Sequence, residues 1–139
     1  MSEPPDRVYV AYADGASRGN PGPSAIGVVI FDAEGREVHR ESRRVGHGTN
    51  NEAEYRAAIA ALEAALGLGA SRVELRMDSE LVVRQLTGRY RVRNPRLAPL
   101  YGRVLGLRNR FQSTTFRNIP RTNNRPADTL ANQALDRSS

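Results

Sequence analysis

The spacing of apolar residues changes partway along this chain, and that change limits the folds open to it. Residues 7–13 and 24–32 are nearly continuous apolar runs, which is typical of buried strands, and residues 36–45 alternate as a half-exposed strand does. From Asn51 to Leu68 the apolar residues recur at helical spacing instead. The first third of the chain therefore predicts three strands, and the segment after it a long helix.

Turn residues join the three strands. The stretch 14–23 holds three Gly and two Pro, which predicts a loop without regular structure, and residues 32–35 predict a tight hairpin turn. Strands joined in this way form an antiparallel meander.

The second half of the chain alternates helices and strands. Gly67 and Gly69 end the long helix, and residues 72–77 alternate Val73, Leu75 and Met77 with charged residues as in a strand. Four further segments follow: helix 79–87, a helix within 95–111 that contains Pro99, strand 114–119 and helix 127–136. The order βββαβααβα has a helical crossover, which implies parallel pairing. We expect an α/β (α+β) fold, a five-stranded mixed sheet with helices on both faces.

Length and composition set outer limits. A chain of 139 residues predicts one domain over 1–139, with residues 1–6 and 137–139 as flexible tails. The absence of Cys excludes disulfides and thiolate chemistry. No apolar run approaches the roughly 20 residues of a membrane span, and the polar first residues do not resemble a signal peptide. We expect a cytoplasmic monomer that does not contact a membrane.

The charge favours an anionic partner. The formal net charge is +6, and all 21 basic residues are Arg. Arg holds phosphate through paired hydrogen bonds, and a basic surface gains affinity for nucleic acid by releasing counterions. Genome composition also explains a preference for Arg over Lys, but it leaves the charge in place.

Four acidic residues occupy settings that would bring them together. Asp14 and Asp78 follow apolar runs, Glu54 lies one turn inside the long helix, and Asp128 starts the last helix. The carboxyl ends of neighbouring parallel strands share one edge of a sheet, so these side chains are expected to converge there. Taken one by one, they also suit a turn, a solvated helix face, a helix N-cap and a helix N-terminus.

Converging carboxylates would repel one another unless cations neutralised them. Oxygen ligands suit Mg²⁺ or Mn²⁺, and two such ions can clamp a phosphoryl displacement. The four acidic residues therefore predict a two-metal phosphodiester-cleaving site.

Four segments resemble the motifs of the type 1 ribonuclease H family, in the family's order. They are Asp14–Pro23, Thr49–Tyr55, Met77–Val83 and Asn124–Asn132. The resemblance implies the ribonuclease H-like fold and an endonuclease that cuts the RNA strand of an RNA–DNA hybrid, leaving 5′-phosphate and 3′-hydroxyl ends.

It also implies that Asp14, Glu54, Asp78 and Asp128 bind metal and catalyse. It implies substrate contacts from eight residues, Asn20, Thr49, Asn50, Asn51, Ser79, Glu80, Arg121 and Asn124. Amide side chains can both donate to and accept from a 2′-hydroxyl, which would distinguish RNA.

The chain departs from the best-known bacterial members in three places. Their basic insertion between the third and fourth motifs is missing, and the Arg-rich segment 88–96 is a candidate replacement. The loop before Asp128 has no His, and Arg121 stands there instead, although an Arg cannot act as a general base. Glu80 stands at a position where Gln is common in those members. A carboxylate at this position would either join the metal ligands or weaken contact with the substrate.

Two other hypotheses stay open on the sequence. One is a module that binds RNA–DNA hybrid or double-stranded RNA without cutting it. The other is a junction resolvase or transposase-like nuclease of the same fold. The four carboxylates count against the first, and the Asn50–Asn51 pair and the short length against the second.

Overall fold

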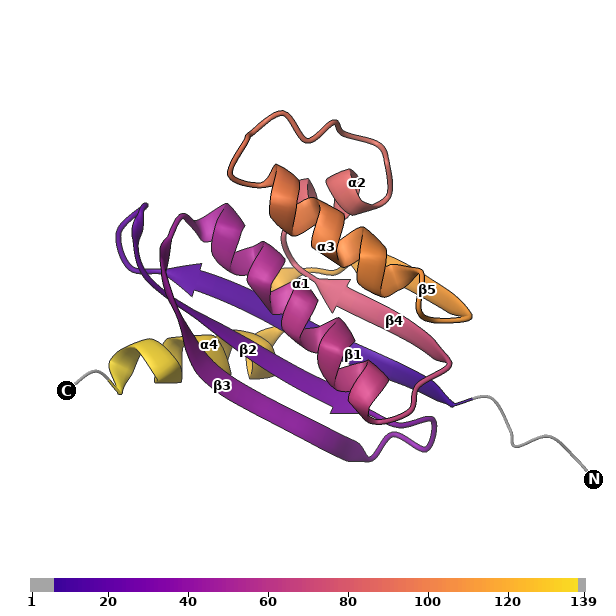
Figure 1. The fold of residues 1–139 in the computed structure, drawn as a ribbon. Helices are drawn as coiled ribbons and strands as arrows, with labels where there is room; N and C mark the ends of the chain where they lie inside the picture. Colours follow the sequence, from indigo (N-terminus) through magenta and orange to yellow (C-terminus); the bar gives the residue numbers. More distant parts are fainter. Residues whose placement is uncertain (1–6, 138–139) are drawn as a thin grey trace, which may run out of the picture.

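Three antiparallel strands and two parallel ones form a single mixed sheet in the computed structural model, which describes residues 7–137 (Figure 1). β1 (Val8–Ser17), β2 (Gly22–Phe31) and β3 (Glu37–Gly48) make the expected meander. β4 (Arg72–Met77) runs parallel to β1, and β5 (Ser113–Asn118) parallel to β4. The strand order is β3-β2-β1-β4-β5.

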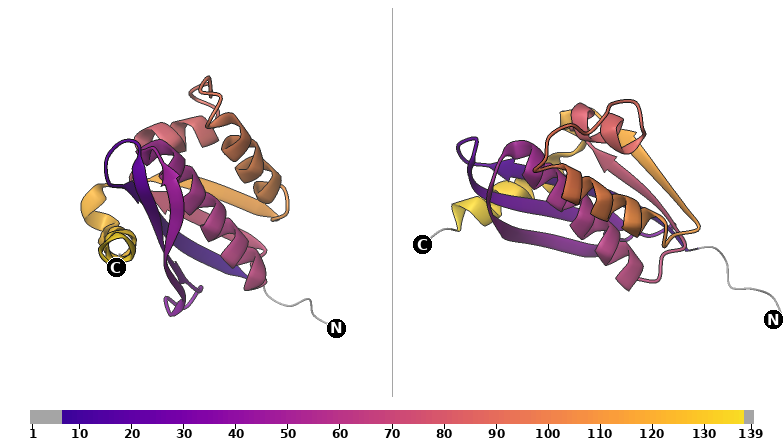
Figure 2. Two further views of the ribbon diagram at one scale, coloured as in Figure 1. Left: turned by 60° about the vertical axis from the view of Figure 1, so that its left-hand side comes forward. Right: turned by 45° about the horizontal axis from the view of Figure 1, so that its top comes forward.

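Helices cover both faces of this sheet. α1 (Asn50–Gly67), α2 (Glu80–Leu86) and α3 (Ala98–Arg108) lie on one face, and α4 (Arg125–Asp136) lies on the other (Figure 2). A short 3₁₀ turn, η1 (Arg121–Asn123), leads into α4. The predicted fold class and the order βββαβααβα are confirmed. No helix among residues 7–137 has both the length and the apolar character needed to cross a membrane.

The core lies between the sheet and α1. Tyr55, Leu62, Leu75 and Met77 are fully or almost fully buried there. The hydroxyl of Tyr55 donates to Gln85 Oε1 at 2.5 Å, which joins α1 to α2 through a buried polar contact. The apolar side chains of β2 are buried on both faces because α4 packs behind the sheet, as a continuous apolar run predicts.

Two glycines let helices approach the sheet closely. A Cβ on Gly15 would lie 2.2 Å from the backbone carbon of Ala53 in α1. A Cβ on Gly27 would lie 2.0 Å from the carbonyl oxygen of Ala127 in α4. Because these helices carry Glu54 and Asp128, both close approaches help to position acidic residues.

The predicted boundaries needed one clear correction. The stretch 14–23 was expected to be a loop, but β1 continues to Ser17 and β2 begins at Gly22. Antiparallel pairing with Ser24 and Ala25 extends β1 through residues that rarely form strands on their own, because long-range pairing outweighs local preference.

Of the two predicted tails, residues 1–6 and 137–139, the structure describes Arg137 alone. Residues 1–6 and 138–139 lie outside the described residues. Arg137, which the prediction placed in the tail, donates to the carbonyl oxygen of Ser42 at 2.9 Å.

Candidate active site

The pairing of β1 with β4 sets the centre of the site. Tyr12 is opposite Arg76 in this parallel pair, so continuing the register by two residues brings Asp14 opposite Asp78. Asp78 directly follows β4, as expected. Asp14 lies inside β1, three residues before its end, where the sequence predicted the strand to stop. Because β4 is the shorter strand, both carboxylates still stand at its carboxyl end.

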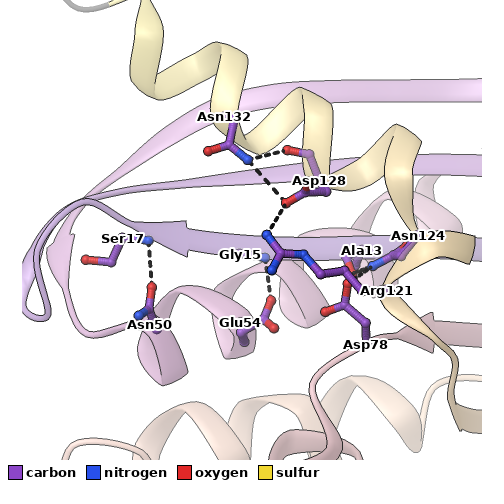
Figure 3. Close-up of polar contacts among 10 residues, drawn as sticks. All are labelled: Ala13, Gly15, Ser17, Asn50, Glu54, Asp78, Arg121, Asn124, Asp128 and Asn132. Atoms are coloured by element: carbon purple, nitrogen blue, oxygen red, sulfur yellow. Dashed lines mark hydrogen bonds and ion pairs between the residues drawn. The ribbon is translucent and has the colours of Figure 1, made fainter.

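Glu54 reaches the same place from α1. Thr49 caps this helix through a reciprocal capping box with Glu52, which fixes where the helix begins. One turn later, the carboxylate of Glu54 accepts a short hydrogen bond from the backbone N–H of Gly15. Figure 3 shows this contact crossing from α1 to β1.

Three carboxylates converge at this point. Asp14, Glu54 and Asp78 each offer one oxygen, and these oxygens all lie within 4.8 Å of one another. Asp14 is 6% exposed and Glu54 8% exposed, so two of the three charges are largely removed from water. The convergence expected from the sequence is therefore present.

The fourth carboxylate belongs to the same cleft but stands slightly apart. Asp128 lies in the first turn of α4, and its Oδ1 accepts from Asn132 Nδ2 at 3.2 Å. It is close enough to Asp14 for a side-chain hydrogen bond that raises the pKa of Asp14. Nη2 of Arg121 lies 3.9 Å from Asp128 Oδ1.

Burial and mutual repulsion disfavour the charged forms of the cluster. Burial raises the pKa of Asp14 most, and the nearby charge of Glu54 raises it further. Burial also raises the pKa of Glu54, although the hydrogen bond from Gly15 opposes this. The pKa of Asp78 is raised by burial, against the effects of Asn124 and Arg121. Such a cluster stabilises its charged form by binding cations.

The residues present fit divalent metal. Among the described residues, carboxylate oxygens of Asp14, Glu54 and Asp78 converge in the cleft, and oxygen donors suit Mg²⁺ or Mn²⁺ rather than softer ions. The raised pKa values of Asp14, Glu54 and Asp78 mark a site whose negative charge is only partly offset by the protein itself.

Asn124 lies beneath the cleft and not on its surface. It is fully buried, and its Nδ2 donates to Ala13 O at 3.0 Å and to Asp78 Oδ2 at 3.4 Å (Figure 3). Among the described residues, its Oδ1 is the buried side-chain atom without a hydrogen-bond partner. The structure thus places Asn124 behind the carboxylates, with its side chain removed from the surface of the cleft.

The cleft has a volume of about 510 Å³ and a rim of polar residues. At one end, Asn50 Oδ1 accepts from the backbone N–H of Ser17 at 2.9 Å, and the backbone N–H of Asn50 donates to Asn20 Oδ1 at 3.1 Å. Asn20 and Asn50 are exposed; Asn50 and Asn51 line the cleft, whereas Asn20 lies outside its lining. These amides are placed to meet a ligand lying over the carboxylates.

Of the remaining residues expected in the site, Ser79 and Arg121 line the cleft and Glu80 does not. Ser79 lines the cleft and caps α2 by accepting from Val82 N at 3.4 Å, and Arg121 also lines it. Glu80 does not line the cleft, because its carboxylate pairs with Arg84 at 2.8 Å one turn along α2.

Four residues that line the cleft were not among the expected site residues, and two of them, Ser17 and Asn132, have polar side chains. Asn132 was detectable, since it follows Asp128 by four residues and must share its helix face. Ser17 was not identified as a cleft residue because the chain there was predicted to be a loop.

The fold and the acidic cleft define the ribonuclease H-like class. The family described as reverse transcriptase-like matches residues 12–134. Ribonuclease H1 from Halobacterium salinarum superposes with a TM-score of 0.92 and 46% identity, covering 94% of this chain and 99% of that one. The structure of LC11 ribonuclease H1 in complex with an RNA/DNA hybrid gives a TM-score of 0.87 and 43% identity, covering 92% and 96% of the two chains.

A curated relative is the bifunctional protein Rv2228c of Mycobacterium tuberculosis, which is 45% identical over 128 residues. That alignment covers 91% of this chain and 35% of the relative, so the chain spans about a third of that protein's length. The chain belongs to the type 1 ribonuclease H family.

Proposed function

We propose that this protein is a divalent-metal-dependent endonuclease that hydrolyses the RNA strand of RNA–DNA hybrids. The observation that carries the proposal is the meeting of Asp14, Glu54 and Asp78 oxygens within 4.8 Å, from β1, α1 and the end of β4. A similar protein with 43% identity is described in complex with an RNA/DNA hybrid, which supports this choice of substrate.

Asp14, Glu54, Asp78 and Asp128 would hold two Mg²⁺ or Mn²⁺ ions when hybrid is bound. Such ions would activate a water for attack on phosphorus and stabilise the leaving 3′ oxygen, which would yield 5′-phosphate and 3′-hydroxyl ends. The protein contributes rigidity: Gly15 N–H orients Glu54, and Asn124 orients Asp78.

The amides at the rim would select the RNA strand. Asn50 and Asn51 line the cleft, and Asn20 accepts from the backbone N–H of Asn50 next to it. All three amides can exchange hydrogen bonds with 2′-hydroxyls and base edges. Asn20 and Asn50 are held by contacts to backbone groups, so their orientation is fixed before substrate arrives. A net charge of +6 would favour approach to the nucleic-acid backbone.

Proton transfer would not use the loop before α4. Arg121 stands there, and a guanidinium remains protonated at any physiological pH, so it acts only as a cation. The proton released by the attacking water would pass to solvent or to the substrate itself.

A cleavage assay on matched substrates tests the proposal. Labelled RNA–DNA hybrid, duplex RNA, duplex DNA and a four-way junction would each be incubated with Mg²⁺, Mn²⁺ or EDTA. We expect cleavage of the RNA strand in the hybrid only, dependent on metal, with 5′-phosphate ends. Tight hybrid binding without cleavage in either metal would favour a binding module, and junction cleavage a resolvase.

A further inference from the structure

Arg121 holds an unusual position for a basic residue. Among the described residues that line the acidic cleft, it is the only one with a positive charge. Figure 3 shows its side chain extending from η1 across the cleft toward Asp128, with the guanidinium among the carboxylates. Its Nη2 lies 3.9 Å from Asp128 Oδ1, and its charge also acts on Asp78.

The contact is an ion pair and not a fixed hydrogen bond. A separation of 3.9 Å exceeds hydrogen-bonding distance, and the side chain of Arg121 is 80% exposed. Asp128 is held instead by Asn132, whose Nδ2 donates to it at 3.2 Å. The guanidinium can therefore leave without disturbing the position of Asp128.

Two cations cannot share the same carboxylates without repulsion. The guanidinium offsets part of the negative charge of Asp128 and Asp78. A divalent ion bound by those carboxylates would bring two further positive charges into the same space, so Arg121 would have to turn outward into solvent. Because the ion pair of Arg121 is lost when metal binds, the free energy of metal binding is less favourable by the free energy of that ion pair.

We propose that Arg121 is an internal counter-cation that competes with divalent metal for Asp128 and Asp78. It keeps the metal-free cleft partly neutralised and lowers the affinity of the site for metal. This inference rests on the proposed function, because it assumes that the cleft binds divalent ions. Once turned outward, the same guanidinium is free to hold a substrate phosphate.

Metal titration without substrate tests the inference. Binding of Mn²⁺ would be measured by calorimetry for the unaltered protein and for Arg121→Ala, Arg121→Lys and Arg125→Ala, at 0.15 M salt. Arg125 is exposed in the first turn of α4 and does not line the cleft, so its loss controls for net charge alone. Arg121→Ala should bind Mn²⁺ about two- to fivefold more tightly, the range expected for losing an exposed ion pair. Arg121→Lys should bind Mn²⁺ with nearly the original affinity.

The outcomes separate this inference from the proposed function. Equal Mn²⁺ affinities for the Arg121→Ala and Arg125→Ala proteins would overturn the competition, even if both cut hybrid. Failure of the unaltered protein to bind Mn²⁺ at millimolar concentrations, with no metal-dependent cleavage, would remove the proposed function and this inference with it. Thermal unfolding in EDTA gives a second readout, since Arg121→Ala should lower the Tm of the metal-free protein while Arg125→Ala should not.

Discussion

At the scale of single residues, the buried carboxylates of the cleft destabilise the folded protein when they are charged. Asp14 is almost fully buried, and both burial and Glu54 raise its pKa. Asp14→Asn should abolish cleavage because the proposed metal site loses a ligand. It should also raise the free energy of unfolding in EDTA at pH 7 by about 1.4 kcal/mol or more, the equivalent of one pKa unit.

Urea denaturation with EDTA present measures this stability change, and the hybrid assay measures the activity. Asp136→Asn is the matched control, since that carboxylate is 63% exposed and lies at the far end of α4. It should leave cleavage intact and should not stabilise the protein. A destabilised Asp14→Asn protein would contradict the view that repulsion and burial dominate at this position.

Asn124 should matter for stability and for metal binding together. Its Nδ2 joins Ala13 O in β1 to Asp78, and the contact with Ala13 O is buried. Asn124→Ala should cost about 1–3 kcal/mol in unfolding free energy, because Ala13 O loses a donor that water cannot replace. Asn118→Ala is the control, since Asn118 also donates to a backbone oxygen, Met77 O, but is exposed. An equal loss in both variants, measured by urea denaturation, would remove the special role of burial.

At the scale of elements, the site depends on how closely α4 can approach β2. Gly27 has no room for a Cβ, which would lie 2.0 Å from Ala127 O, one residue before Asp128. Gly27→Ala should therefore displace α4 and lower stability by about 3 kcal/mol, the upper end of the range typical of overpacking. Gly102→Ala in α3 is the control: nothing lies within 4 Å of its Cβ, so it should stabilise by about 0.5–1 kcal/mol. Thermal unfolding would show both changes, and a neutral Gly27→Ala would contradict the packing.

The Arg-rich segment 88–96 is a second element with a testable role. Its arginines are exposed, and Gln85 Nε2 anchors its backbone at Arg91 O with a contact of 3.5 Å. Arg89→Ala with Arg93→Ala should weaken hybrid binding and reduce the slope of log affinity against log salt by about 0.9 per lost phosphate contact. The control pair Arg36→Ala with Arg40→Ala, around the β2–β3 turn, should leave this slope unchanged. Equal slopes in the two double variants would leave the segment without a substrate role.

At the scale of the whole molecule, features that follow from the spacing of residues along the chain could be predicted from the sequence. Features set by contacts between distant segments could not. Residues 72–77 alternate so regularly that β4 was predicted with its true ends. The convergence of Asp14 and Asp78 followed from strand order alone. The extension of β1 to Ser17, the burial of Asn124 and the position of Arg121 beside Asp128 could not be predicted, because each is set by a distant segment.

The electrostatics of the whole molecule lead to an unusual dependence of stability on pH. Asp14, Glu54 and Asp78 have raised pKa values in the folded state, so above the ordinary carboxyl pKa of about 4 the folded protein binds more protons than the unfolded chain. Metal-free stability should therefore fall as pH rises from about 5 to 8. Carboxylates with lowered pKa values, such as Asp32 and Glu52, act in the opposite direction but only as pH falls below about 4.

Divalent metal should reverse this trend, because it binds the charged carboxylates and binding grows as they lose protons. Urea denaturation at pH 5 and pH 8, with EDTA or with Mn²⁺, measures both effects. We expect the protein in EDTA to be less stable at pH 8 than at pH 5, and the protein in Mn²⁺ to gain most at pH 8. The Asp14→Asn protein should lose much of both responses. Stability in EDTA that rises from pH 5 to pH 8 would show that other groups, and not the acidic cleft, control the pH dependence of folding.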